Sequence, residues 1–100
     1  MKAIWNDVIV AEAPKEDLIF IEGNWYFPPS ALHKEYYTES ATHTTCVWKG
    51  EANYYTIGID GAVNQDAAWY YPSPKPSAID QVKKDFTKYV AFWRGVQVKE

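Results

Sequence analysis

The chain has one cysteine, no long apolar run and no excess of positive charge. A single thiol, Cys46, cannot form an intramolecular disulfide or a cysteine-rich zinc site, and such usage is typical of a reducing, cytoplasmic compartment. A membrane helix needs about 20 consecutive apolar residues, and Met1–Asp7 reaches a turn signal before a signal-peptide core can form. Without such a run we expect no membrane partner, and because the net charge is −3 we expect no duplex nucleic acid partner.

Several catalytic motifs are also missing. The sequence has no P-loop, no dinucleotide-binding glycine motif, no HExxH, no CxxC and no nucleophile elbow. No Asp-x-Asp or Asp-x-Glu pair offers the carboxylates of a two-metal site. We therefore expect neither a cofactor nor a metal.

What the chain has in abundance is aromatic side chains, which make up 17% of its residues. One hundred residues are enough for one core, so residues 1–100 are expected to form a single domain. Short β-branched and aromatic segments alternate with tight turns. This pattern predicts a mainly β fold, a compact antiparallel sheet system with one or two short helices.

The predicted strands follow from alternation and turn chemistry. Asn6-Asp7 and Asp60-Gly61 are expected to be hairpin turns, because these residue types tolerate positive φ. The expected strands are Lys2–Trp5, Val8–Glu12, Leu18–Glu22, Trp25–Phe27, Tyr36–Thr38, Ala52–Asp60, Ala67–Tyr71, Tyr89–Trp93 and Val96–Val98.

The segments between these strands are predicted to be short helices and loops. Ser30 is expected to cap a helical turn over Ala31–Lys34, and Glu39–Thr42 to be a polar loop. The four residues from Ser77 to Asp80 resemble a capping box with Asp in place of Glu or Gln. We therefore expect a helix over Ser77–Phe86.

The stretch richest in reactive groups is residues 43–50, which contains the only cysteine. Cys46 is a candidate nucleophile, although free cysteines are also often simply buried. His43 is poorly placed to be its base, because three residues of extended chain span about 10 Å. In a regular strand Cys46 and Trp48 share a face and Lys49 points away, so Cys46 and Lys49 join one site only if the chain bends.

The aromatic stretches favour a small-ligand pocket, because such pockets have aromatic walls and a few polar groups. Strand alternation nevertheless sends about half of these side chains into the core. In this hypothesis Cys46 is the nucleophile, Lys49 steadies an anionic group and Glu22 is the acid or base. The expected walls are Tyr26, Trp48, Trp69 and Tyr70.

Four stretches together resemble one known family. They are EGNWYFP (22–28), TCVWKG (45–50), DAAWYYP (66–72) and VAFWRG (90–95). They are similar to a small, mostly bacterial family that is catalogued only as a domain of unknown function, number four hundred and twenty-seven, and is sometimes labelled nucleotidyltransferase-like. The resemblance covers essentially the whole chain.

The resemblance implies a compact Mss4-like, or β-tent, fold in which two antiparallel sheets lean together. Many proteins of that group bind zinc through paired CxxC motifs, which are absent here, so the metal does not carry over. Val47 and Trp25 depart from the family's usual Pro and frequent His. Nucleotidyl transfer is poorly supported, because the carboxylate pair that such chemistry commonly uses is missing.

The matched positions complete the predicted site. The catalytic candidates are Cys46, Lys49 and Glu22. The ligand-binding candidates are Asn24, Tyr26, Trp48, Trp69, Tyr70 and Arg94.

Two functions stay open. The first is binding of, or catalysis on, an unidentified small molecule; nucleotide stacking aided by Lys49, Lys75 and Arg94 is a weaker version of it. The second is a non-catalytic interaction domain. In that case a homodimer forms through exposed edge strands, an aromatic surface and the proline loop Pro72–Pro76.

Overall fold

The computed structural model describes all 100 residues, and antiparallel sheets dominate it. The first sheet has the order β2-β1-β9, the second is the hairpin β3-β4, and the third has the order β5-β6-β7-β8. The strands are β1 (Lys2–Trp5), β2 (Val8–Glu12), β3 (Ile19–Ile21), β4 (Asn24–Tyr26), β5 (Tyr37–Cys46), β6 (Gly50–Ile59), β7 (Ala62–Tyr70), β8 (Val90–Phe92) and β9 (Gln97–Lys99). The expected mainly β fold is confirmed.

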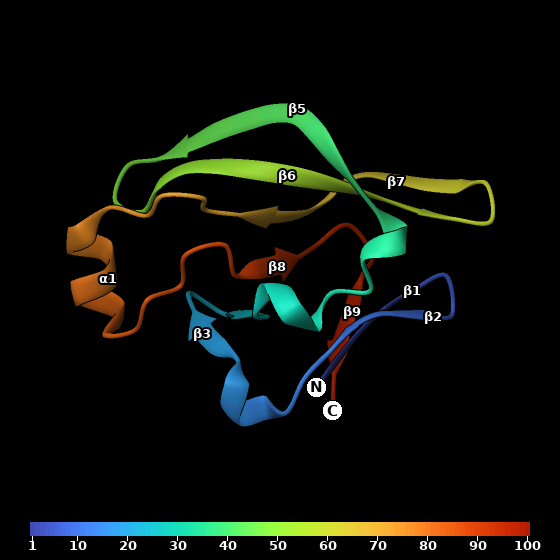
Figure 1. The fold of residues 1–100 in the computed structure, drawn as a ribbon, viewed down its shortest axis with the longest axis horizontal. Helices are drawn as coiled ribbons and strands as arrows, with labels where there is room; N and C mark the ends of the chain where they lie inside the picture. The colour runs from blue at the N-terminus through green and yellow to red at the C-terminus, as the bar shows by residue number, and fades with distance from the viewer.

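Figure 1 shows how these sheets are arranged. Strands β5, β6 and β7 form one long layer, α1 (Pro76–Val82) lies at one end, and the sheet of β1, β2 and β9 lies toward the other. Phe27 and Val90 exchange two backbone hydrogen bonds of 2.8 Å, which tie the β3-β4 hairpin to β8. This link brings the turn of that hairpin against the large sheet.

The large sheet has a hydrophobic cluster on each face, because neighbours along a strand point in opposite directions. Tyr70 and Phe27 belong to one cluster, and Tyr71 and Tyr26 belong to the other. Each aromatic stretch therefore contributes to both faces, as alternation predicts.

The remaining regular structure is short. Three 3-10 turns cover Lys15–Asp17, Pro29–Ala31 and Lys34–Tyr36, and α1 is the single α-helix. None of these helices has the length and apolar character needed to cross a membrane.

The two predicted hairpin turns are confirmed, with φ values of 53° and 61° at Asn6 and Asp7 and of 47° and 82° at Asp60 and Gly61. Strand β3 is shorter than predicted. Glu22, with a φ of 50°, already belongs to the turn that precedes β4.

Three local predictions are wrong. Residues 39–42 are not a loop but the middle of β5, an edge strand whose polar exposed residues give no apolar alternation. No helical turn runs over Ala31–Lys34, because the 3-10 turns lie on either side of Leu32. The helix ends at Val82 rather than Phe86, because Lys83 adopts a left-handed conformation, and no side chain caps its start at Lys75.

Candidate functional site

The chain makes the bend that a shared site for Cys46 and Lys49 requires. Strand β5 ends at Cys46, a turn covers residues 47–49, and Gly50 pairs back with Cys46 as β6 begins. Gly50 has a φ of +119°, and a Cβ there would lie 3.4 Å from the Ser73 carbonyl oxygen. Glycine is therefore needed at the point where the Pro72–Pro76 loop packs against this turn.

Lys49 is the centre of the site. Its side chain is turned inward, and the residue is only 6% exposed. The ammonium donates a hydrogen bond to Glu22 Oε1 and forms an ion pair with it. It also lies 5.0 Å from the ring centroid of Trp48 and 5.3 Å from that of Tyr71. The positive charge is thus held by one carboxylate and two aromatic faces.

Burial alone would lower the pKa of Lys49, but the hydrogen bond to Glu22 and the neighbouring Tyr26 outweigh it, and the pKa is raised. Lys49 is therefore an ammonium at neutral pH. An amine nucleophile must be unprotonated, so this arrangement suits a fixed cation and not a covalent role.

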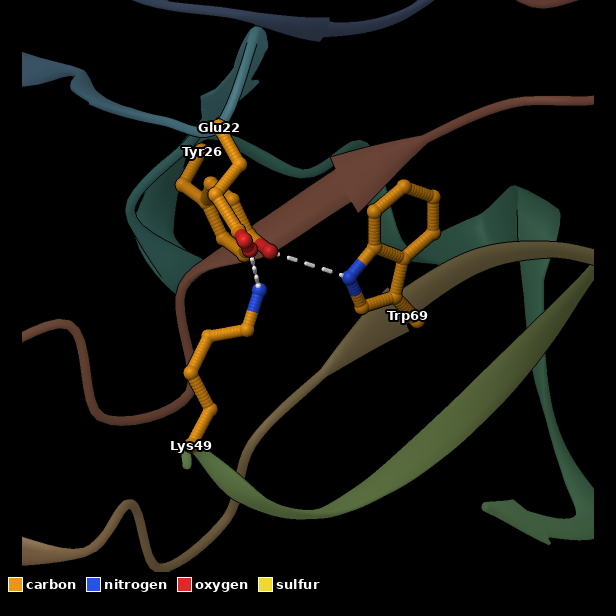
Figure 2. Close-up of polar contacts among 4 residues, drawn as sticks. All are labelled: Glu22, Tyr26, Lys49 and Trp69. Atoms are coloured by element: carbon orange, nitrogen blue, oxygen red, sulfur yellow. Dashed lines mark hydrogen bonds and ion pairs between the residues drawn. The ribbon is translucent and has the colours of Figure 1, made fainter. Parts of the chain in front are cut away.

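Tyr26 and Trp69 complete the polar network. The Trp69 indole N–H donates to the Tyr26 hydroxyl oxygen at 3.1 Å, and the two rings meet edge to face at 6.2 Å. Burial raises the pKa of Tyr26, which stays a neutral phenol. Figure 2 shows Glu22 and Tyr26 from the β3-β4 hairpin meeting Lys49 and Trp69 from the large sheet.

We call this group the Lys49 cluster: Glu22, Tyr26, Trp48, Lys49, Trp69 and Tyr71. Cys46 lies beside it, half-buried against the same hydrophobic core. The Cys46 thiol has no hydrogen-bond partner, and His43 Nδ1 is instead 2.7 Å from Asn53 Oδ1. His43 therefore does not act on Cys46, in agreement with the spacing argument.

Three predicted ligand-binding residues lie apart from this network. Tyr70 follows Trp69 in β7 and faces the other side of the sheet, where its hydroxyl donates to Glu39 at 2.7 Å. Arg94 stacks on Trp93 at 4.7 Å and donates to the Gln65 carbonyl at 3.2 Å. Asn24 is half-buried in β4 opposite Ile21, and its side chain makes no hydrogen bond.

The largest hollow in the molecule is on Tyr70's side of the sheet. This tyrosine cavity has a volume of about 430 Å³ and is lined by Pro29, Leu32, Lys34, Tyr37, Glu39, Tyr55, Tyr70 and Lys88. Among these residues, only Tyr70 was a predicted site residue. Glu39 lies opposite Tyr55 across β5 and β6, and this pairing indicates the cavity. It can be predicted from the sequence only if β5 is predicted at its full length.

The match to a known protein family extends over the whole chain. A family model described as a domain of unknown function (DUF427), labelled NTP_transf_9, matches residues 1–100. The chain belongs to the DUF427 family. A search of curated proteins finds no match.

Three of the four stretches that carried the resemblance supply the entire Lys49 cluster of this DUF427 domain. Residues 22–28 contribute Glu22 and Tyr26, residues 45–50 contribute Trp48 and Lys49, and residues 66–72 contribute the rest. The fourth stretch, residues 90–95, contains the β8 backbone that binds Phe27 and positions the hairpin. The stretches of the resemblance therefore converge on one place in the fold.

Proposed function

We propose that this domain binds a small molecule at the Lys49 cluster, where the Lys49 ammonium steadies an anionic group of the ligand. One observation carries the proposal: the cation is almost completely buried, whereas the side chain of its partner Glu22 is 54% exposed. A buried charge must be paired, because leaving it unpaired costs several kcal/mol. Glu22 stands on a surface turn, so a ligand carboxylate or phosphate can take its place without uncovering the core.

Aromatic side chains supply the remaining contacts. The faces of Trp48 and Tyr71 already flank the ammonium, and the Tyr26 hydroxyl is neutral. Such walls orient a ligand through its apolar part while Lys49 holds its charged end.

A catalytic version of this site requires Cys46 as the nucleophile and Glu22 as acid or base. No base forms a hydrogen bond with the Cys46 thiol, so we propose binding and treat catalysis as a separate prediction. Alkylation of Cys46 measured against pH tests it. A thiol that reacts only above its ordinary pKa of about 8.5 removes the nucleophile from the mechanism.

The binding proposal is tested with inorganic phosphate and acetate as probes, observed through the Trp69 indole N–H signal in NMR spectra. Lys49→Met keeps the aliphatic stem and removes the charge, so it should abolish the titration. Glu22→Gln leaves the ammonium without a competing carboxylate and should tighten anion binding several-fold. Lys99→Met, on the exposed strand β9, is the matched control and should bind as the wild type does.

Equal titrations in the wild type and in Lys49→Met would overturn the proposal. If Lys49→Met does not fold, as judged by circular dichroism, Glu22→Gln decides alone. Its affinity must then rise, because repulsion between the two anions is removed.

The second candidate function is a homodimer, and one feature of β5 favours it. This ten-residue strand pairs with β6 on one side only and has neither Lys nor Pro along its sequence. Edge strands without such residues readily pair with another chain. Sedimentation at high concentration tests this: a dimer should be lost in Thr45→Lys and kept in the helix control Gln81→Lys. A wild-type monomer would count heavily against it.

Two finer expectations belong to the same proposal. The lone free thiol of Cys46 is typical of a reducing environment, which supports a cytoplasmic location. The β3-β4 hairpin joined to the large sheet is compatible with the Mss4-like arrangement that the resemblance implies. Neither bears on the ligand.

A further inference from the structure

The tyrosine cavity is a second hollow of ligand size, separate from the Lys49 cluster. Its volume of about 430 Å³ lies within the range of small-molecule sites, about 300–1,000 Å³. Tyr55 and Tyr70 stack with ring centroids 4.7 Å apart, and Tyr37 meets Tyr55 edge to face at 5.5 Å. The cavity therefore has aromatic walls of defined geometry.

Hydrogen bonds hold two of these rings in place. The Tyr37 hydroxyl donates to the Val10 carbonyl at 2.8 Å, and the Tyr70 hydroxyl donates to Glu39 Oε1 at 2.7 Å. A ligand that enters finds walls that are already ordered, which lowers the entropic cost of binding.

The charges of the cavity favour an anion. Lys34 and Lys88 line it and are exposed, and neither forms an ion pair; the two ion pairs of the molecule involve other lysines. Glu39 is the only acidic residue of the lining, and one of its oxygens already accepts the Tyr70 hydrogen bond. Two lysines and one glutamate leave a formal charge of +1 on the lining.

We propose that the tyrosine cavity binds a small aromatic anion. The ring of the ligand packs against Tyr37, Tyr55 and Leu32, and its carboxylate faces Lys34 and Lys88. The site is independent of the function proposed for Lys49, because it lies on the other face of the sheet and shares none of that cluster's residues.

Three probes of nearly equal shape and different charge test this: benzoate, benzamide and benzylamine. Ligands of this size bind proteins with a Kd of about 1 mM, which NMR titration of the labelled protein measures. Benzoate should bind most tightly and benzylamine least, with shifts at Tyr37, Tyr55 and Lys88. The proposal would be overturned if benzylamine bound most tightly or if all three probes bound equally. It would also be overturned if no shifts appeared at probe concentrations about twentyfold above that Kd.

Shifts at Trp48 and Trp69 instead would also overturn it, because the aromatic anion would then occupy the Lys49 cluster. That outcome would leave the proposed function intact. The two proposals can therefore fail separately.

Variants that change the charge of the cavity should change the affinity for benzoate in a defined direction. The double variant Lys34→Gln and Lys88→Gln should weaken benzoate about three- to tenfold, since each exposed pair contributes modestly. The control removes the same charge elsewhere, with Lys83→Gln and Lys99→Gln, and should change little. Glu39→Gln should act in the opposite direction and tighten benzoate. Equal effects of the double variant and its control would show that only net charge matters and would refute the site.

Discussion

The two faces of the large sheet combine carboxylate, lysine and aromatic rings in opposite arrangements. In the Lys49 cluster the cation is buried and its carboxylate partner is half-exposed. In the tyrosine cavity the ring of Tyr70 is buried and the charges of Lys34, Glu39 and Lys88 are exposed. A buried charge must keep a partner, whereas an exposed charge can exchange partners with water. Lys49 therefore needs an anionic partner at all times, either Glu22 or a ligand that replaces it, whereas Lys34 and Lys88 do not.

Raising the pH should unfold the protein by ionising tyrosines on both faces of the large sheet, and this is the largest effect we expect. Burial raises the pKa of tyrosines on each side, namely Tyr26, Tyr37, Tyr55, Tyr70 and Tyr71. A tyrosine whose pKa is higher in the folded state stabilises that state fully below its unfolded-state pKa, about 10. This stabilisation is lost as the pH rises toward the folded-state pKa. All five pKa values are shifted in the same direction, so their effects on the free energy of unfolding add at high pH.

The expected result is cooperative unfolding above about pH 10, in which phenolate absorbance and loss of circular dichroism coincide. Ionisation of these tyrosines near their ordinary pKa in a protein that stays folded would contradict it.

Removing the carboxylate of each face, one at a time, should lower the free energy of unfolding by unequal amounts. Glu22→Ala leaves the buried Lys49 ammonium unpaired and should lower the free energy of unfolding by about 2 kcal/mol. Glu39→Ala removes an exposed acceptor that water can replace, and should cost about 0.5 kcal/mol. Urea denaturation measures both. Equal losses would mean that burial of Lys49 is not what distinguishes the faces.

Removing one hydroxyl from each face should give a smaller difference of the same sign. Tyr26→Phe deprives the Trp69 indole N–H of its acceptor inside the protein and should cost about 1 kcal/mol. Tyr70→Phe removes a donor to the exposed Glu39 and should cost about half as much. Thermal unfolding of the two variants provides the comparison, and a larger loss in Tyr70→Phe would reverse our interpretation.

The smallest expected effect concerns the pKa values themselves. Burial raises the pKa of both Tyr26 and Tyr55, but Lys49 lowers that of Tyr26 and Glu39 raises that of Tyr55. Lys49→Met should therefore raise the pKa of Tyr26, and Glu39→Gln should lower that of Tyr55. Urea denaturation between about pH 9 and pH 10 measures both, because the free energy of unfolding falls more steeply with pH when the folded-state pKa is higher. Changes of the same sign in the two variants would contradict this account.

Local chemistry made part of the fold predictable. The turns at Asn6-Asp7 and Asp60-Gly61 depend on backbone preferences of adjacent residues, which a sequence displays directly. The helix that ended early shows the limit of this approach. Phe86 continues the helical spacing and is buried, yet it reaches the core from a loop because Lys83 has already left the helical conformation.

The middle of β5 was missed for a different reason. Its residues are polar because one edge and much of its surface face solvent, so no apolar alternation identifies it. That error also hid Glu39, the acidic residue of the tyrosine cavity.

The candidate site was predictable in its residue types but not in its geometry. Cys46, Trp48 and Lys49 were identified from one short stretch, and the need for a bend was foreseen. Glu22 was assigned to the same site, but its ion pair with Lys49 was not predicted, because the two residues are 27 apart in sequence and meet only through the β3-β4 hairpin. The separation of Tyr70 from Trp69 follows from alternation alone, and was underused when both were assigned to one pocket.

The two-residue turn at Asp60-Gly61 and an irregularity further along β7 together have a consequence for both faces. The turn starts the pairing of β7 with β6, and the register then shifts between Ile57↔Asn64 and Tyr55↔Ala68, where Asp66 has a φ of 54°. Beyond this point β7 carries Trp69 to one side and Tyr70 to the other. A further shift of one residue would exchange the two, placing an indole over Glu39 and a phenol beside Tyr26. The number of residues in the turn and in the irregular stretch therefore decides which side chain each site receives.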